Sequence, residues 1–278
     1  MRTLLRRLLV AVAAVSMATL PGALSAPAAA APTWAPAASA TVHPGVVMDT
    51  AGGQCTSNFV FVDRAGAVYL GQAAHCAGTG TATETDGCTS ASLPLGTPVT
   101  IDGASKPGTL AYSSWTTMQA RGETNPDVCA YNDFALVRVD PADVARVNPS
   151  VPHWGGPTAL GSGSTRVGQQ VVSYGNSPLR GGISVLSPKQ GTSLGDEGAG
   201  WSHVVLTVTP GVPGDSGSGF MDTQGRAIGV LSTLNVAPLA GTNGVGDLSR
   251  ELRYAQQTSG ISGLGLVRGT APFQASLL

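Results

Sequence analysis

The segment Pro213–Gly219, with the sequence PGDSGSG, constrains this chain more than any other feature. Glycines on both sides of Asp215-Ser216 permit a sharp loop that exposes the Ser216 hydroxyl and leaves main-chain N–H groups free to bind an oxyanion. The same letters also fit an ordinary tight turn, and in isolation the two interpretations are about equally good. The loop therefore needs a base elsewhere in the chain before it predicts catalysis.

Two upstream motifs supply the groups that a serine nucleophile needs. His75 lies in the sequence AAHC, and Asp133 lies in the sequence NDFALV. A serine hydroxyl needs an imidazole to take its proton, and a buried carboxylate on the far ring nitrogen fixes the tautomer of that imidazole. The apolar run after Asp133 suits a buried strand, which would hold the carboxylate rigidly. The order His, Asp, Ser is one of the known triad orders, so the conjunction favours a catalytic site.

With these motifs the chain resembles the chymotrypsin/trypsin-like serine protease family over residues 52–255, and the motif GVLS, which ends at Ser232, is a further anchor. The resemblance implies that His75 is the general base, that Asp133 orients and stabilises it, and that Ser216 is the nucleophile. It also implies that the hydroxyl of Ser232 lies beside Asp133. The expected activity is that of a serine endopeptidase.

The loop around Ser216 carries a second implication of the resemblance. The main-chain N–H groups of Gly214 and Ser216 would form the oxyanion hole, and a buried ion pair of Asp215 would keep this loop formed. In animal members an amino terminus of the Ile-Val-Gly-Gly type supplies the cation, and this chain has no such motif. Arg180 or Arg166 is then the alternative partner, and the secreted bacterial branch of the family, in particular the actinobacterial one, is the better match.

Residues 1–31 have the pattern of a secretory signal peptide. Arg2, Arg6 and Arg7 precede an apolar stretch, and small residues at 28–30 offer a cleavage site. The adjacent arginines leave the twin-arginine export route open beside the general one. The apolar stretch is too short to favour a membrane anchor. We therefore expect a secreted, extracellular protein.

The four cysteines favour two disulfides, because an even number in an exported chain without a Cys-x-x-Cys pair argues against free thiols and against a zinc site. Three pairings are open on the sequence alone. The family resemblance implies a bridge between Cys55 and Cys76, next to the catalytic histidine, which leaves Cys88 to pair with Cys129. Both bridges would then brace the triad.

We expect residues 32–50 to be an Ala/Pro-rich leader without a fold of its own and residues 51–278 to form one protease domain. Short β-rich runs alternate with Gly, Pro, Ser and Asn turns, which is typical of all-β barrels or sandwiches. The predicted strands lie at 58–62, 67–70, 99–101, 134–139, 170–174, 204–208 and 227–231. A short helix is predicted at 246–256, capped by Asp247 or Ser249. The resemblance implies two six-stranded antiparallel barrels, with the active site in the cleft between them and this helix at the C-terminal end.

Charge and composition limit the classes of molecule that the protein is expected to bind. The chain has 15 basic and 16 acidic residues, and removal of the three N-terminal arginines would leave a formal net charge of about −4. The remaining basic residues are scattered, which argues against nucleic acid as a partner. We expect a protein or peptide substrate, no stable membrane insertion and a monomer. No cofactor motif or protein metal site is visible in the sequence, and only a surface calcium site stays open.

Substrate preference is constrained more weakly. The resemblance places the primary specificity pocket at 210–212, 232–234 and 242–246, where no acidic residue would pair with a buried Lys or Arg side chain. A small or apolar residue before the scissile bond is therefore expected, unless Asp247 folds inward. His43, His153 and His203 are interpreted as structural or solvated.

Two other functions stay open. An inactive family member could bind a partner outside the cell with the same cleft, or the same fold could act as an esterase. An esterase of the α/β-hydrolase type is not indicated, because the Gly-x-Ser-x-Gly elbow is missing around Ser216.

Overall fold

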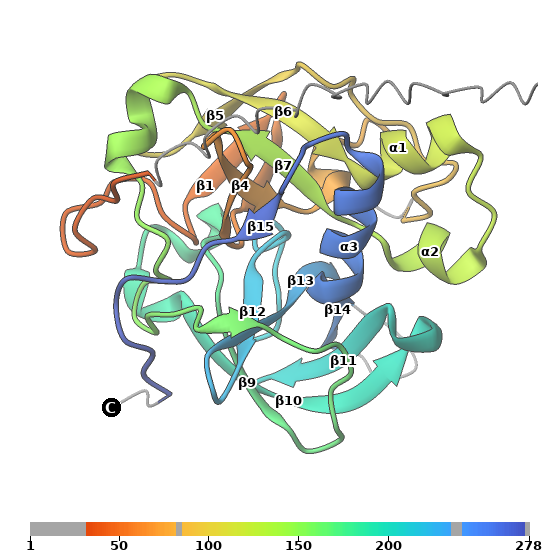
Figure 1. Cartoon of the computed structure of the whole chain (residues 1–278). Helices are drawn as coiled ribbons and strands as arrows, with labels where there is room; N and C mark the ends of the chain where they lie inside the picture. The colour runs from red at the N-terminus through yellow and green to blue at the C-terminus, as the bar shows by residue number, and fades with distance from the viewer. Residues whose placement is uncertain (1–31, 82–84, 235–240, 276–278) are drawn as a thin grey trace, which may run out of the picture.

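The computed structural model describes residues 32–81, 85–234 and 241–275, which fold into two mainly antiparallel sheets with three α-helices between and around them (Figure 1). The predicted signal peptide, residues 1–31, lies outside the described residues. None of the helices in the described ranges is both long enough and apolar enough to span a bilayer.

The first sheet is built mostly from the N-terminal half of the chain. Its eight strands, in spatial order, are β15 (Gly265–Leu266), β3 (Val60–Val62), β4 (Val68–Gln72), β7 (Ala135–Arg138), β6 (Gly108–Ser113), β5 (Pro98–Ile101), β1 (Val47–Thr50) and β2 (Gly53–Thr56). Strand β4 is buried along its whole length because β3 and β7 flank it on both edges. Within the described residues no pairing joins the outer strands β15 and β2, so this sheet is not closed by a hydrogen-bonded seam.

The second sheet is closed. Its strands, in spatial order, are β12 (Gly219–Asp222), β9 (Gln170–Tyr174), β10 (Pro188–Glu197), β11 (Ser202–Thr207), β14 (Thr242–Asp247), β13 (Arg226–Leu234) and β8 (Ala159–Leu160). An additional antiparallel pairing between β12 and β13 joins six of them into a barrel, and β8 adds to β13 in parallel. A core of six apolar side chains fills the barrel: Val171, Val205, Phe220, Ile228, Leu231 and Val245.

The α-helices are α1 (Ser114–Arg121), α2 (Pro126–Tyr131) and α3 (Leu248–Thr258). Short 3-10 helices are η1 (Ala74–Ala77), η2 (Pro141–Arg146), η3 (Pro178–Arg180), η4 (Ser184–Leu186) and η5 (Gly198–Gly200). Helix α3 begins at Asp247, whose carboxylate accepts the main-chain N–H of Arg250 at 2.8 Å. Of the two predicted caps, Asp247 is therefore the one used, and the Ser249 hydroxyl donates to the same carboxylate.

The largest core joins the two sheets and α3. It contains Phe59 and Phe134 from the first sheet's side, Met221 from the barrel, and Leu252 from the inner face of α3. Figure 1 shows α3 lying beside β7 and above β13 and β14. This packing matters for function because the segments before β7 and after β4 meet the loop before β12 along the same boundary.

All seven predicted strand regions coincide with strands of the structure, and the predicted helix corresponds to α3. One expectation needs correction. The first sheet has eight strands, because the short β2 and β15 extend it, and only the second forms a closed six-stranded barrel. Residues before the expected boundary at 51 also take part in packing: β1 (Val47–Thr50) belongs to the first sheet, and Val42, Val46 and Met48 are buried in its core. Alanine and proline around these residues hid their apolar pattern.

Candidate active site

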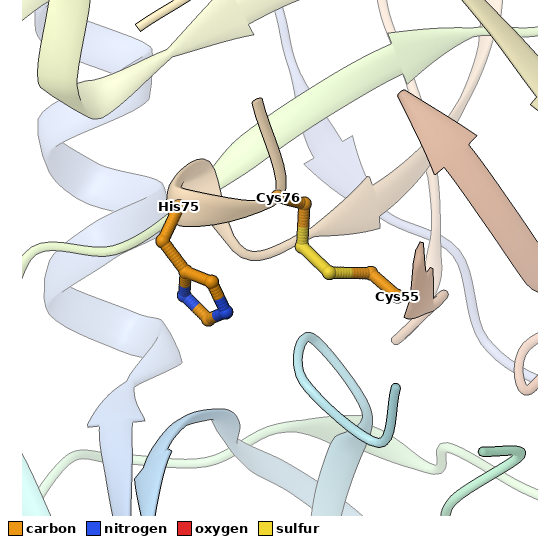
Figure 2. A group of neighbouring side chains, drawn as sticks. All are labelled: Cys55, His75 and Cys76. Atoms are coloured by element: carbon orange, nitrogen blue, oxygen red, sulfur yellow. A yellow bond between two sulfur atoms is a disulfide. The ribbon is translucent and has the colours of Figure 1, made fainter. Parts of the chain in front are cut away.

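His75 lies on η1, which follows β4 almost directly. A disulfide between Cys55 and Cys76, with Cα atoms 6.1 Å apart, ties the neighbouring residue to β2. Figure 2 shows His75 and Cys76 side by side on η1, with the disulfide reaching from Cys76 to Cys55 on a neighbouring segment. The backbone that carries His75 is thus anchored to two different strands.

Asp133 occupies the turn between α2 and β7, and only 3% of it is exposed. One carboxylate oxygen, Oδ1, accepts the main-chain N–H of His75 at 2.8 Å, and the other, Oδ2, lies 2.6 Å from the His75 Nδ1 atom, which donates to it. The hydroxyl of Ser232, on β13, donates to the same Oδ2 at 2.6 Å. The structure therefore brings three predicted site residues together across the boundary between the two sheets.

These contacts set the protonation of the pair. Burial alone would lower the pKa of His75, but the charge and hydrogen bond of Asp133 outweigh it and raise the pKa above the ordinary histidine value. Burial would raise the pKa of Asp133, but the contacts with His75 and the Ser232 hydroxyl hold that pKa below its usual range. Asp133 therefore stays ionised while His75 gains and loses a proton, which is what general base catalysis requires.

Ser216 and His75 both line one cleft, which has a volume of about 850 Å³. With Nδ1 of His75 donating to Asp133, Nε2 is the nitrogen available as a base. In the part of the chain that the structure describes, no hydrogen bond joins the Ser216 hydroxyl to His75. Such a contact commonly shortens only when substrate is bound, so the geometry is compatible with the predicted roles.

The loop before Ser216 presents the two predicted oxyanion donors. The N–H groups of Gly214 and Ser216 donate to no other group within the described ranges. By contrast, the N–H of Asp215 donates to the carbonyl of Val212, and the N–H of Gly217 donates to the carbonyl of Leu231 on β13. Gly214 has φ +95°, and a Cβ atom there would lie 2.8 Å from Cδ of Pro178. Only glycine fits this position without strain.

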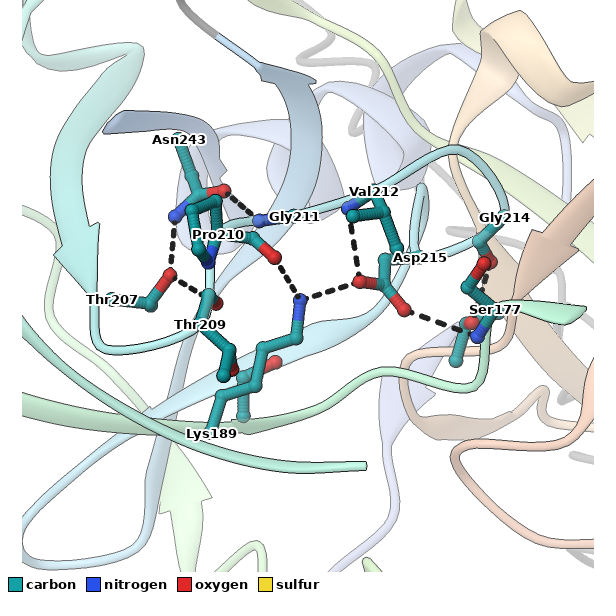
Figure 3. A network of polar contacts seen from close by, with 12 residues as sticks. Ser177, Lys189, Thr207, Thr209, Pro210, Gly211, Val212, Gly214, Asp215 and Asn243 are labelled. Carbon is teal, nitrogen blue, oxygen red and sulfur yellow. Dashed lines mark hydrogen bonds and ion pairs between the residues drawn. The ribbon is translucent and has the colours of Figure 1, made fainter. Parts of the chain in front are cut away.

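Asp215 is completely buried and is held by two cations. Arg180 donates to its carboxylate, and Nζ of Lys189 lies 2.5 Å from Oδ2. The N–H groups of Ser177 and Val212 donate to the same carboxylate at 3.1 Å each. Figure 3 shows Lys189 reaching Asp215 from one side and Ser177 from the other.

The ion pair resolves one open alternative and adds an unexpected residue. Of the two predicted partners of Asp215, Arg180 makes the contact, and Arg166 is exposed elsewhere. Lys189 was not predicted, and its side chain is only 1% exposed. Burial is the main influence on Lys189 and leaves its pKa below the ordinary lysine value despite the opposing charge of Asp215. Burial would raise the pKa of Asp215, but the two cations hold it below its usual range.

The second disulfide joins Cys88 to Cys129, with Cα atoms 5.1 Å apart. Cys129 is in α2, the helix that precedes Asp133. The bridge therefore restrains the segment that leads to the Asp133 carboxylate. Both pairings are those implied by the family resemblance. The described clusters of potential metal ligands each include two cysteines of one of these bridges, and a disulfide sulfur is not the thiolate that metals bind.

The other three histidines lie away from the cleft lining. His43 contacts the carbonyl of Pro44, and His153 packs edge-on against Trp154. His203 is buried, and its ring nitrogens lie 2.7 Å from an Asp196 oxygen and 3.1 Å from an Asp247 oxygen. Two carboxylates around one histidine were not expected, but they serve the barrel and the cap of α3. This arrangement gives His203 a structural position.

The segments expected to form the specificity pocket do line the cleft. Gly211, Val212, Leu231, Ser232 and Gly244 are among its wall residues, and no acidic side chain comes from these segments. The carboxylate of Asp247 faces His203 and the first turn of α3, so it does not enter the pocket. One acidic residue, Glu197, does line the cleft, but it lies outside the three segments expected to form the pocket. Its carboxylate accepts a hydrogen bond from the Ser202 hydroxyl.

Sequence reasoning also missed Glu251, a buried residue of α3. Its Oε1 accepts the main-chain N–H of Asp133 at 3.0 Å. A signal was present, because position 251 lies three residues after Leu248 and one before Leu252, on the apolar face of the helix. A carboxyl group at such a position needs a specific partner.

Comparisons with known proteins identify the family and the fold. A family model for the trypsin-like peptidase domain matches residues 60–230. No curated protein sequence is similar enough to count as a relative. Among solved structures, Thermobifida fusca Protease A has 19% sequence identity and a TM-score of 0.52, covering 82% of this chain and 99% of its own.

Two further solved structures are similar to the chain. The Nocardiopsis protease has 19% identity and a TM-score of 0.46, covering 81% of this chain and 98% of its own. Cellulomonas bogoriensis chymotrypsin has 18% identity and a TM-score of 0.47, with the same two coverages. The chymotrypsin-like fold is confirmed, and because the family match spans more than half of its length, the chain belongs to the trypsin-like peptidases and is a serine endopeptidase.

Proposed function

We propose that this protein is an exported endopeptidase that cleaves peptide bonds through an acyl-enzyme on Ser216. The observation that carries the proposal is the Asp133 carboxylate, which accepts hydrogen bonds from His75 and Ser232 at the edge of a cleft that Ser216 also lines. A buried carboxylate, an imidazole and a serine that lines the cleft are the parts that acyl transfer needs.

The steps follow from the contacts. Nε2 of His75 takes the proton of the Ser216 hydroxyl as its oxygen bonds to the substrate carbonyl carbon, and Asp133 stabilises the resulting imidazolium. The carbonyl oxygen gains negative charge and is bound by the N–H groups of Gly214 and Ser216. His75 then gives its proton to the leaving amine as the peptide bond breaks. A water molecule, deprotonated by His75, releases the acyl group from Ser216.

A small or apolar residue before the scissile bond fits the pocket segments best. Their walls carry glycine, valine and leucine at Gly211, Val212 and Leu231, which would leave a buried basic side chain without a countercharge. Asp247, the residue that would have reversed this preference, is committed to His203 and α3. Two disulfides and the N-terminal export pattern support an extracellular enzyme. The proposal takes it to act as a monomer on protein or peptide substrates.

The test is covalent labelling of the secreted, signal-cleaved protein with a fluorophosphonate, followed by peptide mass spectrometry. We expect selective modification of Ser216, and we expect Ser216→Ala to lose both labelling and turnover while it stays folded. Ser218→Ala is the matched control, because this buried hydroxyl two residues away has no hydrogen-bond partner within the described ranges.

The outcomes separate the candidate functions. Labelling of Ser216 together with amide hydrolysis supports the endopeptidase, whereas ester turnover without amide turnover supports an esterase on the same fold. A folded protein that neither labels nor hydrolyses either substrate contradicts the proposal and points to an inactive binding module. Retained hydrolysis by Ser216→Ala would reject Ser216 as the nucleophile.

A further inference from the structure

Glu251 is a buried carboxyl group on a helix face that is otherwise apolar. Leu248, Leu252 and Ala255 form the inner stripe of α3, and Glu251 lies between them without exposed surface. Removing a carboxyl group from water is costly unless specific contacts offset the loss. A packing role alone would be filled better by leucine or methionine.

The one described polar partner of Glu251 is the triad carboxylate residue itself. Oε1 accepts the main-chain N–H of Asp133 at 3.0 Å, across a sequence separation of 118 residues. Oε2 is buried without a hydrogen-bond partner among the described residues. Strand β14 leaves room for this contact, because a Cβ atom at Gly246 would lie 2.4 Å from Oε1.

This contact completes the restraint on Asp133. Its carboxylate oxygens are fixed by two donors of His75 and by the Ser232 hydroxyl, and its main-chain N–H is fixed by Glu251. The N–H group is attached to the same Cα atom as the carboxylate side chain. Movement of the main chain at Asp133 would therefore displace the hydrogen bond to Nδ1 of His75.

The surroundings favour the uncharged form of Glu251. The ionisable groups that act on it are the carboxylates of Asp133 and Asp247 and, from β6, the buried phenol of Tyr112. Burial, followed by the negative charge of Asp133, raises the pKa of Glu251 well above its usual range. The unpartnered Oε2 agrees with this, because an ionised oxygen in that place would be left without a donor. A neutral carboxyl group accepts the N–H without adding a second negative charge beside the triad.

We propose that Glu251 is a positioning residue of the active site, which holds the main-chain N–H of Asp133 from α3 and so fixes the carboxylate that orients His75. The inference rests on the roles proposed above for the triad. It gives the C-terminal helix a part in catalysis beyond covering the core.

The experiment compares three variants of the secreted full chain. Glu251→Gln keeps a carbonyl acceptor and a neutral group, Glu251→Leu removes the acceptor at similar volume, and Gln256→Leu is a control that removes a different side-chain hydrogen bond of α3, to the carbonyl of Leu264. Steady-state kcat and KM are measured with p-nitrophenyl acetate over the pH range in which each variant is folded, and folding is checked by circular dichroism.

We expect Glu251→Leu to lower kcat by about 30-fold or more with KM within about 3-fold, because displacement of a catalytic group affects the reaction more than binding. Glu251→Gln should restore kcat to within about 5-fold of the unaltered enzyme. Its acid limb of kcat/KM, which reports His75, should stay within about half a pH unit, because a neutral group replaces a neutral group. Gln256→Leu should behave like the unaltered enzyme.

A folded Glu251→Leu variant with unaltered kcat would overturn the inference. If Glu251→Leu does not fold, Glu251→Gln decides: an acid limb displaced downward by more than about half a pH unit would mean that a negative charge had been removed. Absence of Ser216-dependent turnover in the unaltered protein is a different result, since it rejects the proposed function and with it this inference. Normal turnover with silent Glu251 variants rejects the inference alone.

Discussion

Replacement of Asp215 by asparagine tests the ion-pair network beneath the oxyanion loop. The completely buried carboxylate meets Arg180 and Lys189 and also accepts two main-chain N–H groups. In Asp215→Asn the ammonium of Lys189 loses its countercharge and is left with neutral acceptors, such as the carbonyl of Pro210 at 3.4 Å. Removal of one partner from a buried ion pair costs about 3–5 kcal/mol, because the remaining charge is left unpaired. We expect a loss of that size in the free energy of unfolding.

Lys189→Met should cost less. Methionine fills a similar volume without a charge, and Asp215 retains Arg180 and its N–H donors, so the expected loss is about 1–3 kcal/mol, the contribution of one hydrogen bond to a charged group. In the Asp215→Asn background the sign should reverse. Lys189→Met then removes an unpaired buried charge and should stabilise the protein by about 1–3 kcal/mol.

The assay is urea-induced unfolding at pH 7 of the unaltered protein, both single variants and the double variant. Additive losses, with Lys189→Met destabilising both backgrounds alike, would refute the reasoning. The pH dependence gives a second check. The pKa of Asp215 is depressed in the folded protein, so its stabilisation is present above the unfolded value of about 3.9 and is lost as the pH falls through the lower folded value. The deficit of Asp215→Asn should therefore shrink in acid.

Two more predictions concern catalysis directly. Gly214→Ala places a Cβ atom against Pro178 at a residue with φ +95°, which should displace one oxyanion donor. We expect steady-state kinetics to show a loss of about 100-fold in kcat. An unaltered kcat would show that Gly214 is not part of the oxyanion hole. The pKa of His75 is raised by Asp133, and the neutral imidazole is the active form, so activity should be lost as the pH falls through that raised value. The acid limb of the kcat/KM profile should lie above about pH 6.5, and a limb clearly below it would contradict the contact with Asp133.

The residues at the ends of strands were predictable because their motifs are local. The sequence around His75 places it after an apolar strand, and the sequence around Asp133 places it before another. Both segments then face the loop of Ser216 once two sheets pack against each other. The strand positions were predictable for the same reason, since apolar runs alternating with turn residues are a pattern of neighbouring residues.

Lys189 and Glu251 were not predictable in this way. Lys189 lies in the polar sequence PKQG, where a lone lysine is ordinarily solvated, and only closure of the barrel brings it to Asp215, 26 residues away. The spacing of Glu251 from Leu248 and Leu252 places it on the apolar face of α3, but the local sequence SRELRY does not show which distant group its carboxyl group contacts. In both cases burial comes from contacts between distant segments, and burial is what changes the chemistry of the side chain.

The cations of Asp215 also bear on how the oxyanion loop is maintained. Lys189 is on the barrel strand β10, and Arg180 is on η3 in the connection between β9 and β10, so both belong to the folded domain. The loop that presents Gly214 therefore obtains its countercharge from within the domain, and a newly cut amino terminus is not required to supply it. Two cations on one carboxylate also give redundancy, because loss of either leaves the other in place. We therefore expect that substitution of either cation alone destabilises the oxyanion loop only partly, whereas substitution of Asp215 removes the ion pairs that hold the loop in place.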